Sequence, residues 1–214
     1  MTKPRILIAD DHGILAEGLR RMLEPDFDVV GLVSNGIELI AAAQQWSPDI
    51  IIADITMPEM NGIDALIQLR AQGVTSKVIF LTMHRDVAYA RRATEAGAAG
   101  YLLKHSVSSE LTGAIREVLQ GRTYVTPMIA GELLESYRDA DPSNGKHSKR
   151  LTTRQREVLQ LVAEGRSAKE VARLLSISVR TAEAHKAKIM ETLEFSNTTE
   201  LVQYAIRNGI ISAE

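Results

Sequence analysis

The sequence contains no cysteine, which excludes disulfide bridges, thiolate zinc sites and cysteine nucleophiles. It also lacks an apolar run approaching the roughly 18 residues of a membrane-spanning helix, and its start lacks the pattern of a signal peptide. These absences predict a cytoplasmic protein whose chemistry uses histidine, carboxylate, hydroxyl and ammonium groups. With 45% hydrophobic and 24% charged residues among 214, the composition suits one large or two small globular domains.

The charge balance differs between the two ends of the chain. Residues 1–125 carry 12 Lys or Arg against 15 Asp or Glu, whereas residues 151–214 carry 9 against 8. Within the second segment, residues 166–188 hold six basic and two acidic residues, a local net charge of +4. Such a stretch favours contact with a polyanion, although a solvated helix face would carry the same charges.

Short apolar runs alternate with longer helical patterns over residues 1–125. The runs are too short for helices and are rich in leucine and β-branched residues; they lie at 5–10, 28–33, 49–54, 77–82 and 100–103. Apolar residues recur at helical spacing over 14–23, 36–46, 62–71, 86–96 and 109–120. Five such units predict a mostly parallel sheet with helices on both faces and with ligands at the carboxyl ends of its strands.

The pattern changes after residue 125. An amphipathic stretch predicts a helix at 128–138, and residues 139–149 have no hydrophobic face and contain turn formers, as a flexible linker does. We therefore expect a first domain at 1–125 and a linker segment at 126–149.

Residues 150–214 show only helical patterns and predict an all-α domain. Residues that favour helix N-termini precede four apolar-periodic stretches; they are Thr152 or Thr153, Ser167, Ser178 and Asn197. Gly209 is placed to end the last helix.

Acidic residues end two of the predicted strands. Asp10 and Asp11 follow the first strand, and Asp54 ends the third. In a parallel sheet these carboxylates meet at one edge, where their mutual repulsion requires a shared cation or proton. Oxygen ligands without cysteine favour Mg²⁺.

Two further strand ends add a hydroxyl and an ammonium group, from Thr82 and Lys104. Carboxylate, cation, hydroxyl and ammonium together suit phosphoryl transfer, in which Asp54 attacks phosphorus while Lys104 and the metal neutralise charge on the phosphoryl oxygens. Each residue alone is more often a cap, strand or surface residue. Their joint position at four strand ends favours a site.

At these residues the chain resembles the receiver domains of two-component response regulators. The matching pieces are "DDH", "DITMPEMNG", "LTMH" and "AGAAGYLLK". The resemblance implies a flavodoxin-like (βα)5 fold with sheet order 2-1-3-4-5. It also implies roles for single residues: Asp54 as phospho-acceptor, Asp10 and Asp11 as metal ligands with the backbone carbonyl of Thr56, and Thr82 with Tyr101 as the switch pair.

Three positions near this site qualify the resemblance. His105 follows Lys104 where many receivers have proline, so no cis bond is predicted there. Thr56 and His84 lie two residues after Asp54 and Thr82, and both would tune hydrolysis of an acyl phosphate. For His84, a surface position competes with the role of general base.

Residues 151–211 resemble the four-helix LuxR-type helix-turn-helix domain of NarL/FixJ regulators. The resemblance rests on "LTTRQREVLQLVAEGRSAKEVARLLSISVRTAEAHKAKIMETL" and "ELVQYAIRNGII". The N-terminal half of a helix at 179–193, about 22 Å long at 1.5 Å per residue, would enter the major groove of DNA. Residues expected to face base edges are Glu183, Ala184, Ala187 and Lys188, and those expected to contact phosphates are Lys169, Arg180, Thr181 and Lys186.

The last helix of this family often pairs two DNA-binding domains. Here it has more apolar residues than one narrow stripe requires, and we expect Leu201, Val202 and Ala205 to serve dimerisation. The sequence departs from the family pattern at Ala168, Ala182, Thr192 and Glu194, where Asn, Val, Lys and Gly are expected. Thr192 and Glu194 weaken the positive field, which makes a two-fold site occupied by a dimer more necessary.

Together these patterns predict a response regulator transcription factor. A sensor histidine kinase would pass a phosphoryl group to Asp54 in a Mg²⁺-dependent step, and the chain would then alter its dimerisation and its sequence-specific binding to promoter DNA. It would not be an enzyme towards external substrates, since its own chemistry is limited to self-phosphorylation and loss of that phosphoryl group.

Two other functions compete with this interpretation. The receiver would act as an unphosphorylated interaction module if Asp54 were never modified. A Mg²⁺-dependent phosphotransferase would hydrolyse small phosphoesters through Asp54, but haloacid-dehalogenase enzymes have a second acid where this chain has Thr56, and no substrate-cap insertion is apparent.

Overall fold

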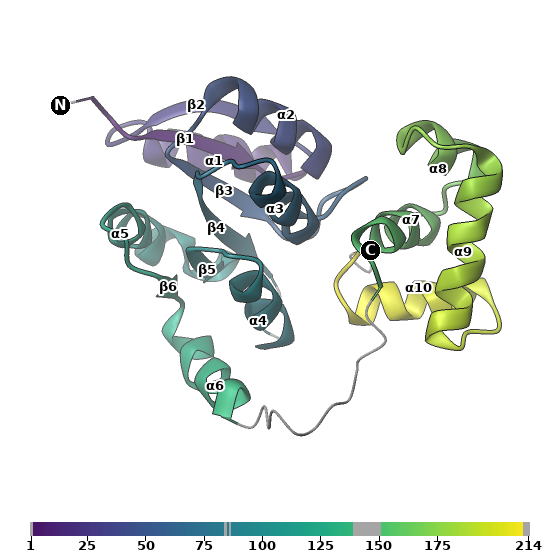
Figure 1. Ribbon diagram of the computed structural model, residues 1–214. Helices are drawn as coiled ribbons and strands as arrows, with labels where there is room; N and C mark the ends of the chain where they lie inside the picture. Colours follow the sequence, from purple (N-terminus) through teal and green to yellow (C-terminus); the bar gives the residue numbers. More distant parts are fainter. Residues whose placement is uncertain (1, 84, 86, 139–150, 212–214) are drawn as a thin grey trace. The chain divides into compact units, whose positions relative to one another are not determined.

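The chain forms two compact units, Met1–Asp141 and Pro142–Glu214, in the computed structural model (Figure 1). The structure describes residues 2–83, 85, 87–138 and 151–211. The linker predicted at 139–149 lies outside the described residues, and so does His84.

The first unit is built on a parallel sheet of order β2-β1-β3-β4-β5-β6. Its strands are β1 (Arg5–Ala9), β2 (Asp28–Val33), β3 (Ile50–Asp54), β4 (Lys77–Thr82), β5 (Gly100–Leu103) and β6 (Tyr124–Val125). The predicted order 2-1-3-4-5 is confirmed. The sequence did not predict β6, because two residues are too few to show a period.

Helices cover both faces of this sheet. They are α1 (Gly13–Leu23), α2 (Gly36–Trp46), α3 (Gly62–Ala71), α4 (Val87–Glu95) and α5 (Val107–Leu119), with a short 3₁₀ turn at Lys104–Ser106. Strand residues alternate between two cores: Ile6 and Ile8 pack with α1 and α5, whereas Leu7 and Ala9 pack with α2, α3 and α4. The alternation follows from the two-residue period of a strand. Both faces of the sheet are therefore covered, and the polar groups lie at the strand ends.

Helix α6 (Pro127–Arg138) starts directly after β6 (Figure 1). Its residues Ile129 and Leu133 are buried in the same core as Tyr89 of α4 and Tyr101 of β5. Helices α4 and α6 therefore pack against each other on one face of the sheet.

The second unit contains α7 (Thr153–Ala163), α8 (Ala168–Leu174), α9 (Val179–Leu193) and α10 (Thr198–Arg207) around one core. The predicted caps form: Thr152 and Ser167 make capping boxes, and the side chains of Ser178 and Asn197 accept from backbone N–H groups three residues later. Helix α10 ends before Gly209, which has φ 54°. The all-α helix-turn-helix prediction is confirmed.

Candidate functional site

Buried carboxylates meet at the carboxyl edge of the central strands. Asp10 follows β1 and is 4% exposed, and Asp54 ends β3 and is 5% exposed. Asp11 and His12 lie at the exposed rim. One ligand atom from each of these four residues lies within 4.8 Å of the others, because neighbouring parallel strands deliver their C-termini to one place.

Lys104, just after β5, reaches into this cluster. Its Nζ lies 2.7 Å from Asp10 Oδ2 and 2.7 Å from Asp54 Oδ2. Burial raises the pKa of Asp54 to about 6, although the Lys104 ammonium group acts in the opposite direction. Burial also lowers the pKa of Lys104, but the two carboxylates outweigh that effect and the net shift is upward. Lys104 is therefore held as a cation between two acids.

The donor set fits a hard divalent cation. Asp10 Oδ2 is buried, and the Lys104 ammonium group lies 2.7 Å from it as an ion pair. Carboxylate oxygens that converge beside an open rim are the ligands Mg²⁺ takes, together with several waters. The backbone N–H of His12 donates to the other oxygen, Asp10 Oδ1, over 2.9 Å, which fixes the direction of Oδ2.

The remaining predicted residues of the first unit lie at or next to this edge. Thr82 is 0% exposed and pairs with Leu103, one residue before Lys104. Tyr101 is 1% exposed and pairs with Phe80, on the core face that α4 and α6 cover. Thr56 donates its backbone N–H to Asp54 Oδ1 at 3.3 Å, so it lies next to Asp54.

The turn after Asp54 is shaped by the approach of α3. A Cβ on Gly62 would lie 2.2 Å from the backbone oxygen of Asp54 and 2.9 Å from Phe80. The Gly62 N–H donates to the Ile55 carbonyl oxygen over 2.8 Å, and Asn61 caps α3. Glycine therefore lets α3 start close against the strand that carries Asp54.

Helix α9 of the second unit presents a polar face to solvent. Its exposed residues include Arg180, Thr181, Glu183, Ala184, Ala187 and Lys188, whereas Ala182 and Ile189 are buried. Lys169 on α8 is also exposed, and Lys186 is half-buried. Lys188 Nζ lies 2.8 Å from Glu191 and the Thr181 hydroxyl lies 2.7 Å from that of Ser178. All of the predicted base-edge residues, and all of the predicted phosphate residues except Lys186, are therefore exposed.

Two of the three predicted dimerisation residues are wrong for that role. Leu201 and Ala205 are each 0% exposed in the core of their own unit. A side chain without accessible surface adds no area to an interface, so these two residues hold α10 onto the other helices. Val202 is half-buried, as are Tyr204 and Ile206, and these remain accessible to a partner.

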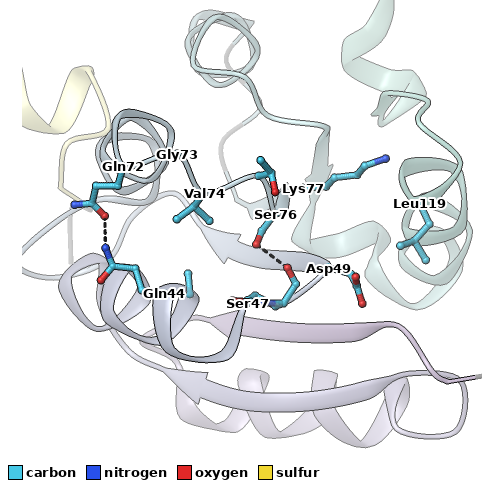
Figure 2. A pocket seen from close by; sticks show the side chains of 12 residues that line it. Gln44, Ser47, Asp49, Gln72, Gly73, Val74, Ser76, Lys77 and Leu119 are labelled. Atoms are coloured by element: carbon cyan, nitrogen blue, oxygen red, sulfur yellow. Dashed lines mark hydrogen bonds between the residues drawn. The ribbon is translucent and has the colours of Figure 1, made fainter.

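A surface pocket lies at the opposite, amino-terminal edge of β3 and β4 (Figure 2). Several of its polar side chains are bonded within the chain: Ser76 donates to the Pro48 carbonyl oxygen over 2.6 Å, and Gln44 donates to Gln72 over 2.7 Å. Because the acids and Lys104 follow the strands rather than precede them, this pocket is separate from the acidic cluster.

His12 belongs to the cluster, yet the sequence reasoning gave it no role. Its Nδ1 lies 3.0 Å from Asp11 Oδ1 and 3.3 Å from Asp10 Oδ1. The available signal was its position directly after two acids at a strand end.

Among the described residues, no helix has the length and hydrophobicity needed to span a lipid bilayer.

Two family models match the chain. Residues 6–116 match "Response regulator receiver domain", and residues 149–205 match "Bacterial regulatory proteins, luxR family". These matches coincide with the sheet that carries the acids and with most of the helical unit.

Characterised relatives align over nearly the whole chain. The oxygen regulatory protein NreC of Staphylococcus carnosus is 34% identical, over 97% of this chain and 99% of the relative. The transcriptional regulatory protein LiaR of Bacillus subtilis is 36% identical with the same coverage of both chains, 97% and 99%. A structure of the response regulator RcsB in complex with DNA is 27% identical, has a TM-score of 0.58 and covers 95% of this chain and 98% of that one.

Proposed function

Since this chain belongs to the NarL/FixJ family of response regulators, with a receiver domain and a LuxR-type DNA-binding domain, we propose that phosphorylation of Asp54 controls its binding to promoter DNA. A sensor histidine kinase supplies the phosphoryl group. The observation that carries the proposal is Lys104, whose ammonium group lies 2.7 Å from both buried carboxylates.

The acceptor chemistry follows from this arrangement. An Asp54 oxygen attacks the phosphorus of a phosphohistidine, the new O–P bond forms as the P–N bond breaks, and the imidazole leaves with the electron pair. With a pKa of about 6, Asp54 is largely ionised at pH 7, so the nucleophile is present without a general base. Lys104 neutralises charge on the phosphoryl oxygens, and the buried Thr82 hydroxyl donates to one of them.

Asp10, Asp11 and Asp54 would hold Mg²⁺ together with the backbone carbonyl of Thr56. The ion supplies charge neutralisation at the phosphoryl oxygens when bound. Asp10 stays fixed for this purpose because its Oδ1 accepts the His12 N–H.

Phosphorylation reaches the rest of the chain through the strand that carries Tyr101. A phosphoryl group adds a charge of about −1.5 to −2 and draws the Thr82 hydroxyl towards it, which changes the space beside Tyr101. Tyr101 shares its core with α6, the last helix of the first unit. Two states of this core would bias dimerisation and hence DNA binding.

DNA binding uses α9 in the major groove. Glu183, Ala184, Ala187 and Lys188 face base edges, and Lys169, Arg180, Thr181 and Lys186 serve phosphates, which set affinity more than sequence preference. A homodimer on a two-fold site, with Val202 near its contact, increases the apparent affinity by bivalent binding.

The test combines modification and binding. The chain is incubated with Mg²⁺ and a small phosphodonor, the modified residue is located by mass spectrometry, and DNA binding and oligomer size are measured before and after. We expect one phosphoryl group on Asp54, with a higher DNA affinity afterwards. Asp54→Asn, which keeps the shape of the side chain, should block both.

Two results would favour the alternatives. An Asp54→Asn variant that signals normally in cells would support an unphosphorylated interaction module. Continuous release of phosphate from small phosphoesters under turnover conditions would support a phosphotransferase.

A further inference from the structure

His12 stands over the open side of the acidic cluster. It is the N-cap residue of α1, and the bond from its backbone N–H to Asp10 Oδ1 fixes the turn that carries the ring. Its Nδ1 lies 3.0 Å from Asp11 Oδ1 and 3.3 Å from Asp10 Oδ1. The imidazole nitrogen and the predicted metal-binding oxygens thus form one group of potential ligands.

These distances match the edge of a coordination sphere. Ligands about 2.1 Å from an octahedral ion are about 3 Å apart when adjacent. Asp10 Oδ2, which is buried and lies 2.7 Å from the Lys104 ammonium group, supplies an oxygen on the inner side. His12, whose side chain is 69% exposed, lies on the solvent side of the cluster.

Imidazole changes which ions such a site prefers. Carboxylate, carbonyl and water oxygens suit Mg²⁺, whereas a neutral imidazole nitrogen suits late first-row ions such as Ni²⁺ and Zn²⁺. We propose that His12 Nδ1 is an additional ligand for these late first-row ions, so that the acceptor site binds them with a nitrogen contact that Mg²⁺ does not use. This inference rests on the proposed function, because it assigns the metal site to the same carboxylates.

The competing role of His12 is that of a hydrogen-bond donor. An Nδ1–H group would also lie about 3 Å from carboxylate oxygens, and it would then orient Asp10 and Asp11 for any ion. The two roles differ in what happens when the nitrogen is replaced by an amide, since a Gln side chain keeps an N–H donor but offers no imidazole ligand.

The experiment measures Ni²⁺ and Mg²⁺ affinities of the full chain by titration calorimetry. In the His12→Gln variant we expect the Ni²⁺ affinity to fall by about 10- to 100-fold, as losses at metal sites do, while the Mg²⁺ affinity changes by less than about twofold. His105→Gln, which alters an exposed histidine outside the cluster, should leave both affinities unchanged. Nitrogen NMR with Zn²⁺ should show a shift at Nδ1 of His12.

Equal losses for the two ions, or an unchanged Ni²⁺ affinity, would overturn the assignment. Asp10→Asn separates this result from a failure of the proposed function. If Mg²⁺ binding is lost in Asp10→Asn while Ni²⁺ binding ignores His12→Gln, only the histidine assignment fails. If Mg²⁺ binding is absent or indifferent to Asp10, the proposed metal site itself fails.

Discussion

At the scale of single residues, the site depends on groups whose neighbours change their properties. Asp54 is a carboxylate held in a buried position by β3, and Lys104 compensates only part of the cost of that burial. The fold therefore keeps Asp54 in a setting that an exposed aspartate does not have.

The burial of Asp54 predicts a pH dependence of stability in Mg²⁺-free buffer. Its pKa is raised from 3.8 to about 6 in the folded chain, so folding favours the protonated form. Stability is then greatest below about pH 4 for this group and falls as the pH rises through 6. Asp54→Asn should remove this fall and raise the free energy of unfolding at pH 7 by about 3 kcal/mol, measured by urea unfolding.

A surface aspartate provides the control for that measurement. Asp26 is exposed and pairs with Arg116 at 3.1 Å, and exposed ion pairs contribute about 0–1 kcal/mol. Asp26→Asn should therefore leave the pH profile between 4 and 7 close to that of the parent. An Asp54→Asn profile that follows the parent would contradict the prediction.

A side chain at position 62 should have a steric effect on Asp54. In Gly62→Ala the new Cβ would meet the Asp54 backbone oxygen at 2.2 Å, so β3 or α3 must shift. We expect a loss of about 1–3 kcal/mol of stability together with weaker Mg²⁺ binding, measured by urea unfolding and calorimetry. Gly113→Ala, on α5 with nothing within 4 Å of the new Cβ, should instead stabilise by about 0.5–1 kcal/mol.

In the second unit, replacing Glu194 by glycine should increase stability. It ends α9 in the left-handed conformation with φ 58° and ψ 38°, which costs a residue with a Cβ about 1–2 kcal/mol. This explains why glycine is expected there. Glu194→Gly should raise the free energy of unfolding by about 1 kcal/mol, whereas Glu191→Gly inside α9 should lower it by a similar amount.

At the scale of elements, β6 and α6 follow β5, the strand that carries Tyr101. The Thr126 N–H donates to the Tyr101 carbonyl oxygen over 3.0 Å, and the Thr126 hydroxyl donates to Glu110 of α5 over 3.1 Å. Helix α6 begins at the next residue and buries Ile129 and Leu133 beside α4. Tyr101 is therefore bonded to the residue that directly precedes α6.

Adjacent leucines on α6 offer a matched test of this connection. Leu133 is 7% exposed and packs in the core, whereas Leu134 is 61% exposed. Leu133→Ser should release α6 and lower hydrogen-exchange protection over 127–138, because a polar group replaces a buried apolar one. Leu134→Ser should keep that protection. If both variants exchange alike, the docking of α6 does not depend on its buried face.

At the scale of the whole molecule, the two proposed sites belong to two units with separate cores. The acids and Lys104 belong to Met1–Asp141, and the exposed face of α9 belongs to Pro142–Glu214. A ligand that binds one folded unit stabilises that unit by mass action, by about 2.7 kcal/mol at 100 times its Kd.

This division predicts two thermal transitions with different responses to Mg²⁺. In calorimetry of the full chain, Mg²⁺ should raise the midpoint of the unit that contains the sheet and leave that of the helical unit unchanged. Asp10→Asn should abolish the increase. A parallel rise of both midpoints would show that the units unfold together.

The sequence by itself determined most of the helices and strands and the acids at the strand ends, because periodicity, caps and strand-end acids are local patterns. The sheet order and the placement of Asp10, Asp54 and Lys104 agree with it. Only the tertiary structure decided that Leu201 and Ala205 are fully buried while Val202 is half-buried, since all three are apolar residues on one helix. It also decided the pairing of β6 and the position of His12 beside the acids. The first contact joins segments that are apart in the sequence and the second depends on the geometry of a turn, and a periodic sequence pattern predicts neither.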